Sequence, residues 1–223
     1  MKPNLFPLTV PLVCAVTFLW ATGLSGADLV RFNATPNSSV KIEGTSTVHD
    51  WLVQGQIIGG YLEVDPALLA ADQKPGPGKI DAKVEVSIPV RSLKSTVEVG
   101  KSLMEQIMLE HLKYPQFQKI TYTLTELTLK EAPAAAGGPY LFDTKGDLTV
   151  AGVKKSISMP VKMVRVSPVR LQFIGSIPLK MSDFGIETPA PKLAVGAIKT
   201  SDDVKISVDW VTLRPTDSGG AAK

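Results

Sequence analysis

The chain has 223 residues, of which 44% are hydrophobic and 20% are charged, a composition typical of a globular protein with room for a hydrophobic core. The formal net charge is +3 and the basic residues are scattered, so the sequence lacks the clustered positive charge of a nucleic-acid-binding protein. One cysteine and two histidines are too few for a zinc, haem or iron–sulfur site, and we therefore expect no metal and no cofactor.

The first 27 residues have the order of a secretory signal peptide. Lys2 supplies positive charge, residues 8 to 20 are apolar, and Ser25, Gly26 and Ala27 are small. The apolar stretch is shorter than the roughly 20 residues that cross a bilayer as a helix, which makes a retained membrane anchor the weaker alternative. We expect cleavage after Ala27, a periplasmic or secreted location, and a mature protein without a stable membrane span.

The first strands of the mature chain are predicted from the residues that flank them. Segments 38–47 and 51–64 are each bounded by Gly, Pro, Asn or Asp, and closely spaced glycines in the second segment suggest strong bending. Residues 79 to 90 alternate clearly, with Val84, Val86 and Ile88 on one face and mostly charged residues on the other. This alternation predicts a half-buried antiparallel strand.

One short helix is predicted after these strands. Ser102 and Glu105 have the spacing of a capping box, and Tyr114-Pro115 is expected to end the helix. The polar face carries charges of both signs, which does not suit a membrane surface. We expect the apolar face to dock over a barrel mouth or a sheet face. That face consists of Met104, Ile107, Met108 and Leu112.

The second half of the mature chain is predicted to be strand. Residues 117 to 129 are rich in Thr, Tyr and Leu, and their apolar face switches, which a bulge near Thr125-Glu126 explains. Many antiparallel strands and one helix predict an all-β fold, either a closed barrel of about eight strands or a sandwich. We expect one domain over residues 28–213 and a disordered tail over 214–223. Further strands are predicted at 141–150, 157–163, 169–179 and 204–210.

One segment contains the residue types of a catalytic triad. Ser46, His49 and Asp50 could supply a nucleophile, a base and an orienting acid. On a strand, however, His49 and Asp50 point to opposite faces, whereas the members of a triad must lie within hydrogen-bond reach. We therefore interpret the segment as structural, with Trp51 at one end of the barrel, and expect no catalytic residues. A carboxylate pair that converges only in the fold, or an enzyme that acts on a lipid, stays open.

Five short motifs occur in order along the chain: GTSTVHDW (44–51), IPVRSLK (88–94), KYPQF (113–117), GDLTVAGVKK (146–155) and MSDFGI (181–186). Together they resemble the YceI-like family of exported lipid- or polyisoprenoid-binding proteins, over roughly residues 30 to 213. The resemblance implies an extended, lipocalin-like antiparallel β-barrel with a lengthwise hydrophobic tunnel for an isoprenoid or acyl chain. It implies binding or carriage, and not catalysis.

Inward-facing positions of the predicted strands form the candidate ligand site. They include methionines, which suit a pocket for a flexible chain but equally fill gaps in a closed core. The interior is therefore either a tunnel for a polyisoprenoid, quinone or fatty-acyl chain, or the filled core of a structural or partner-binding barrel. A homodimer is also left open. The predicted site residues are Val84, Val86, Ile88, Met159, Val161, Met163, Leu171, Phe173, Ile177, Val208 and Trp210.

Overall fold

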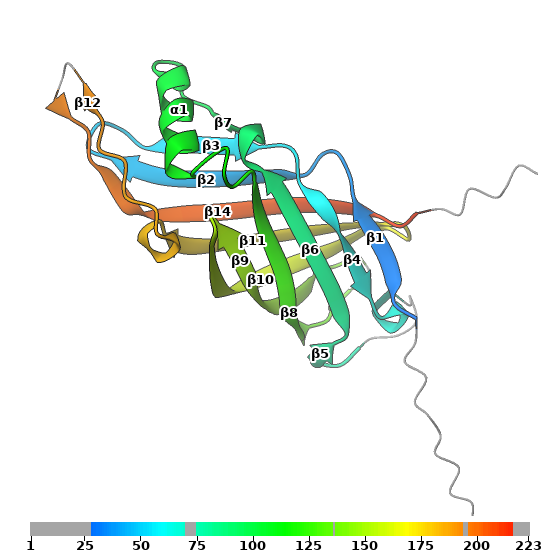
Figure 1. Cartoon of the computed structure of the whole chain (residues 1–223). Helices are drawn as coiled ribbons and strands as arrows, with labels where there is room; N and C mark the ends of the chain where they lie inside the picture. The colour runs from blue at the N-terminus through cyan, green and yellow to red at the C-terminus, as the bar shows by residue number, and fades with distance from the viewer. Residues whose placement is uncertain (1–27, 70–74, 136, 194–195, 216–223) are drawn as a thin grey trace, which may run out of the picture.

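The computed structural model describes residues 28–69, 75–135, 137–193 and 196–215, and shows a closed antiparallel β-barrel (Figure 1). The predicted signal peptide and most of the predicted tail lie outside the described residues. Pairing of the last barrel strand with the first closes the ring, which confirms the predicted fold class. In order around the ring, the eight strands are β1 (Val30–Ala34), β4 (Gly59–Val64), β6 (Ala82–Pro89), β8 (Lys119–Glu131), β9 (Tyr140–Val150), β10 (Val153–Ser167), β11 (Arg170–Lys180) and β14 (Thr200–Leu213).

Three further strands lengthen the barrel wall at one end. β14 pairs with β1 only near its own C-terminus, where Thr212 lies opposite Ala34, and the rest of this edge pairs with β2. β2 pairs in turn with β3, and β3 pairs with β7. We call these three strands the extension. They are β2 (Ser39–Ser46), β3 (Trp51–Gly55) and β7 (Leu93–Ser95).

The strand predictions were wrong at three places. The segment predicted as one strand, 51–64, is two strands, because β3 pairs within the extension and β4 pairs with β1 and β6 in the barrel. The predicted strand 79–90 is interrupted at Asp81, where β5 (Gly78–Ile80) ends and β6 begins. β1 and β7 were not predicted, because strands of five and three residues are too short to show a clear period.

Helix α1 (Lys101–His111) stands beside β7 at the end that the extension lengthens (Figure 1). The predicted capping box is wrong: the helix begins after Gly100, whose φ is 76°, and Ser102 lies in its first turn. Glu105 instead accepts hydrogen bonds from the Ser95 amide and the Lys94 ammonium group, both at 3.2 Å. These two bonds attach the helix to β7.

The predicted bulge in β8 is confirmed. Its register with β9 shifts between Leu124 and Glu126, so that Leu124 and Leu127 both face the barrel interior. Glu126 lies on the outside, where its carboxylate is 2.7 Å from the Lys79 ammonium group and 3.0 Å from that of Lys145. Hydrogen bonds with these two lysines hold the pKa of Glu126 below its ordinary value.

The end of the barrel opposite α1 is filled by close-packed side chains. Phe32 of β1 and Leu129 of β8 are fully buried, and Met163 and Leu171 from the other side of the ring are 1% exposed. Such packing at both sides leaves no passage along the axis at this end. We call this group the plug; it consists of Phe32, Val64, Leu129, Tyr140, Met163 and Leu171.

The remaining elements are short. A hairpin made by β12 (Lys192–Leu193) and β13 (Gly196–Ala197) projects at the α1 end (Figure 1). Among the described residues, three 3₁₀ turns connect strands: η1 (Pro66–Leu69), η2 (Val90–Ser92) and η3 (Ser182–Phe184). The connection of β9 to β10 is tighter, since it has only two residues, Ala151 and Gly152, with φ values of 48° and 82°. Two successive positive φ values are typical of the type I′ hairpin turn.

A residue with a side chain loses about 1–2 kcal/mol when its backbone is left-handed, and we expect Gly152→Ala to destabilise the barrel by more than this amount. The added Cβ would lie 2.3 Å from the Phe117 ring, which must then move. Gly185→Ala is the matched control, because its φ is 64° but the nearest atom to an added Cβ, in Val153, is 3.6 Å away. Urea denaturation of both variants measures the difference, and equal losses would contradict a role for the Phe117 contact.

Candidate functional site

A cavity of about 450 Å³ occupies the barrel between the plug and α1. Its volume lies within the range usual for small-molecule sites, about 300–1,000 Å³. Val99 and Leu103, which line the cavity at the start of α1, are 91% and 42% exposed. The lining residues nearest the plug are largely shielded from solvent. The cavity therefore opens to solvent at the α1 end, which we call the mouth.

The cavity is closed at the plug end, and on different strands the change from lining residue to plug residue occurs between successive inward-facing residues. On β10, Val161 lines the cavity and Met163, the next residue on the same face, belongs to the plug. β8 makes the same change between Leu127 and Leu129. We call the floor the lining residues nearest the plug, one from β2 and one from each barrel strand except β1, which contributes no residue to the lining. It consists of Val40, Leu62, Val84, Leu127, Phe142, Val161, Phe173 and Trp210.

The structure places nine of the eleven predicted site residues around this cavity. For Met163 and Leu171 the prediction that they line the tunnel is wrong, because both lie in the plug. Alternation along a strand identifies the inward face but not the depth at which the cavity ends. That the other nine contact a ligand stays a prediction. They are Val84, Val86, Ile88, Met159, Val161, Phe173, Ile177, Val208 and Trp210.

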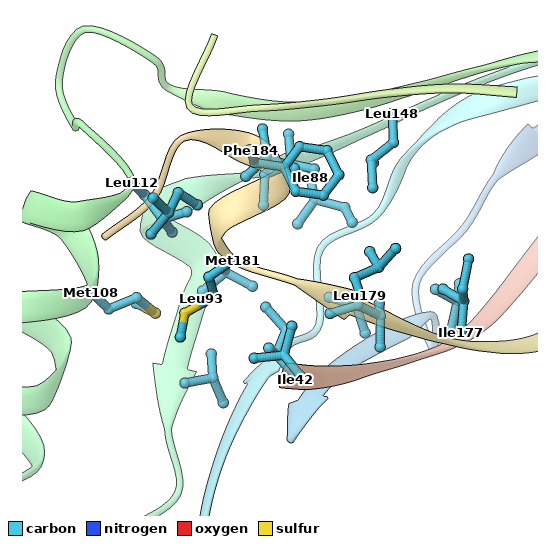
Figure 2. Close-up of a pocket in the computed structure, with 18 of the residues that line it drawn as sticks. Ile42, Ile88, Leu93, Met108, Leu112, Leu148, Ile177, Leu179, Met181 and Phe184 are labelled. Atoms are coloured by element: carbon cyan, nitrogen blue, oxygen red, sulfur yellow. The ribbon is translucent and has the colours of Figure 1, made fainter. Parts of the chain in front are cut away.

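Sequence reasoning missed the residues that α1 and the extension add to the site. Figure 2 shows Met108 of α1 and Leu112, which directly follows the helix, facing the same space as Leu93 of β7 and Ile42 of β2. The helical spacing of the apolar residues predicted that α1 docks through one face, and this face covers part of the cavity. The contributions of Ile42 and Leu93 depend on the pairing of β2, β3 and β7, which no local pattern reveals.

Polar side chains of the lining gather near the mouth. Ser46 and Thr200 lie opposite each other at the ends of β2 and β14, and Lys180 is the last residue of β11. The Lys180 ammonium group lies 3.3 Å from the Asp203 carboxylate, and the hydrogen bond to Asp203 raises the pKa of Lys180. A polar head group at the mouth would therefore lie near the Thr200 hydroxyl and the Lys180–Asp203 ion pair, while the walls below are apolar.

The possible triad residues form a turn instead of a catalytic site. The Ser46 hydroxyl oxygen accepts hydrogen bonds from the amides of Val48 and His49, at 3.3 and 3.2 Å, and donates to the His49 carbonyl at 2.8 Å. The His49 Nδ1 donates to the Asp50 carbonyl at 2.7 Å. Both side chains thus bond the main chain of the β2–β3 turn, as the structural interpretation of this segment requires.

Two aromatic rings of the lining lie directly against glycines. A Cβ added to Gly44 would be 2.2 Å from the Trp51 ring, and one added to Gly146 would be 2.4 Å from the Tyr122 ring. The Trp51 ring is also held by a hydrogen bond from its Nε1 to the Thr45 carbonyl, at 3.3 Å. Glycine at these two inward positions lets the rings lie close to the wall, which leaves the centre of the barrel open.

Two side chains of the lining, Tyr122 and Trp210, have a buried polar atom without a hydrogen-bond partner among the described residues. These atoms are the Tyr122 hydroxyl oxygen and the Trp210 Nε1. Burial raises the pKa of Tyr122, and the nearby Thr144 hydroxyl donates its proton to the Met159 carbonyl, at 2.8 Å, and not to Tyr122. Both atoms are covered by neighbouring groups, so the surface that a ligand meets at this depth is apolar.

Two negative findings apply to the described ranges alone. No three His, Cys, Asp or Glu side chains in them are grouped closely enough to hold a metal ion. No helix there has the length and apolar character needed to cross a membrane.

Comparison with solved structures finds the same fold in three bacterial proteins. A polyisoprenoid-binding domain from Saccharophagus degradans, implicated in plant cell wall breakdown, has a TM-score of 0.60 at 14% identity, over 84% of this chain and 99% of that one. BcnA from Burkholderia cenocepacia has a TM-score of 0.55 at 18% identity, over 78% and 95% of the two chains. The Campylobacter jejuni YceI protein has a TM-score of 0.50 at 18% identity, over 74% and 85%.

No curated protein matches the chain in sequence. The YceI-like domain, in contrast, matches residues 31–212, which span the barrel from β1 to β14 and include the extension and α1. The chain belongs to the YceI-like domain family.

Proposed function

We propose that this protein binds or carries a long-chain apolar molecule, of the polyisoprenoid, quinone or fatty-acyl type, in the barrel cavity. The observation that carries the proposal is the cavity itself, which is blind, has apolar walls and opens at one end. The polyisoprenoid-binding domain of Saccharophagus degradans, which has the same fold, supports the choice of ligand class. The YceI family is generally a binding family, and no catalytic function is indicated.

The distribution of polar groups favours entry of the apolar tail first. Each methylene group removed from water contributes about 0.8 kcal/mol, so a long tail among the apolar walls supplies most of the binding energy. A polar head placed at this depth would lose its hydration without gaining partners, which is unfavourable. At the mouth it can stay hydrated beside Ser46, Thr200 and Lys180. The proposed complex therefore has its head at the mouth and its tail at the floor.

The protein purified from its native source is expected to contain a long-chain apolar molecule. Mass spectrometry of an organic extract identifies this molecule, and the refolded, extracted protein is expected to take it up again. A protein that yields no such molecule and binds neither prenols nor fatty acids after extraction would contradict the proposed function. The packed-barrel alternative, in which the loops bind a partner, would then be favoured.

The proposal also includes export to the periplasm or the exterior. The mature protein from the native source is expected to begin at Asp28, since residues 1 to 27 have the features of a cleaved signal peptide. N-terminal sequencing tests this directly. Recovery of residues 1 to 27 on protein in the membrane fraction would favour the retained anchor instead.

A further inference from the structure

The floor of the cavity includes aromatic rings that pack on one another and on the plug. The Phe173 and Trp210 rings pack with their centroids 5.6 Å apart, and the Phe142 ring stacks on Tyr140 of the plug at 6.4 Å. Phe142 and Trp210 are 3% and 5% exposed. Because the plug behind these rings is close-packed, they cannot retreat without overpacking their neighbours.

The mouth, in contrast, does not limit the length of the bound chain. Val99 and Leu103 line the cavity there and are largely exposed, so a chain that is too long for the cavity can extend past them into solvent. The two ends of the cavity thus act differently on a bound chain: the floor stops the tail, and the mouth lets the excess protrude.

We infer that Phe142, Phe173 and Trp210 determine specificity by limiting the length of chain that the cavity holds. This inference rests on the proposed function and adds to it a selection by chain length. Each methylene that enters the cavity should tighten binding about fourfold. Once the tail reaches the floor, further methylenes stay at the mouth and should add little. A plot of affinity against chain length therefore has a break, and the floor sets its position.

The test measures dissociation constants for two ligand series, the even-numbered saturated fatty acids from octanoate to behenate and the all-trans prenols from geraniol to solanesol. Displacement of a fluorescent fatty acid gives each constant. Phe142→Ala removes a ring from the floor and is expected to move the break to longer chains by at least one member of the fatty-acid series. Val208→Phe adds a ring one step above Trp210 on the same face of β14 and is expected to move the break to shorter chains.

Phe184→Ala is the matched control, because Phe184 (Figure 2) also lines the cavity but lies in η3, which follows Lys180 at the mouth. It removes the same atoms as Phe142→Ala. It is expected to weaken binding of all chains by a similar factor without moving the break. A break at the same length in the wild type, Phe142→Ala and Val208→Phe would overturn the inference.

The outcomes separate the inference from the proposed function. Binding of both series with no break, or with a break that the floor variants do not move, overturns the length limit alone. If no fatty acid and no prenol of the two series binds to the folded wild type, both the proposed function and the length limit are contradicted. Val208→Phe keeps the test decisive if Phe142→Ala does not fold, since the two variants act in opposite directions.

Discussion

Val86→Phe and Val161→Trp are expected to weaken binding of a long-chain ligand by at least tenfold, about 1.4 kcal/mol, while the melting temperature stays near that of the wild type. Both valines line the cavity, one on β6 and the other on β10. A larger side chain at either position enters empty space instead of a packed core. It removes volume and contact surface from the ligand without forcing its neighbours into strained rotamers.

The measurement pairs thermal denaturation with ligand displacement on the same samples. Lys83→Ser is the control, because Lys83 is exposed on the outer face of β6 and its ion pair with Glu63, at 3.8 Å, is a surface contact of little energetic weight. It is expected to change neither quantity. A filled interior predicts a different result: both inward variants would lose about 1–3 kcal/mol of stability from overpacking. Unfolding of both would therefore contradict an open cavity.

Leu129→Ala is expected to cost about 2–5 kcal/mol in the free energy of unfolding, the range for a large-to-small change in a close-packed core. Leu129 has no exposed surface and lies in the plug. Leu124→Ala on the same strand is the matched comparison and is expected to cost less, because Leu124 already faces the cavity. Urea denaturation measures both, and equal costs would show that the two ends of the barrel are packed alike.

The sequence predicted the faces of the strands well. The switch of the apolar face in β8 located the bulge between Leu124 and Glu126, and alternation in β6 and β14 identified residues that line the cavity. These predictions succeeded because the side-chain period of a strand is a local property. The YceI-like motifs added the closed barrel, which local patterns left open against a sandwich.

Depth along the barrel could not be predicted in this way. Met159 and Met163 share a face of β10, yet the first lines the cavity and the second is in the plug. The difference depends on what reaches the same level from other strands, including Phe32 of β1, a strand that was too short to predict. The sequence also left open whether the interior is a tunnel or a filled core. Both descriptions apply in part, because the barrel is open toward α1 and filled at the other end.

The capping box failed for a related reason. The spacing of Ser102 and Glu105 is a local signal, but Glu105 makes its hydrogen bonds with β7, which is not local to the helix. Tertiary contacts of this kind override local preferences. The same contacts bring α1 over the cavity, so the site residues that were hardest to predict are those positioned by the extension.

Fluorescence quenching by fatty acids brominated at defined carbons tests tail-first binding most directly. Trp210 lies on the floor, whereas Trp51 packs on Gly44 nearer the mouth. Gly44 pairs with Val204, which precedes Trp210 by six residues on β14, so the two tryptophans are separated by about 20 Å along this strand. The measurement uses the form that begins at Asp28 and therefore contains only these two tryptophans.

In the Trp51→Phe variant, bromine at the methyl end of the chain is expected to quench Trp210, and bromine beside the carboxylate is not. In the Trp210→Phe variant, Trp51 is expected to show the opposite order. Equal quenching of both tryptophans by every isomer, or quenching of neither by any isomer, would contradict a long apolar chain held in the cavity with its tail at the floor.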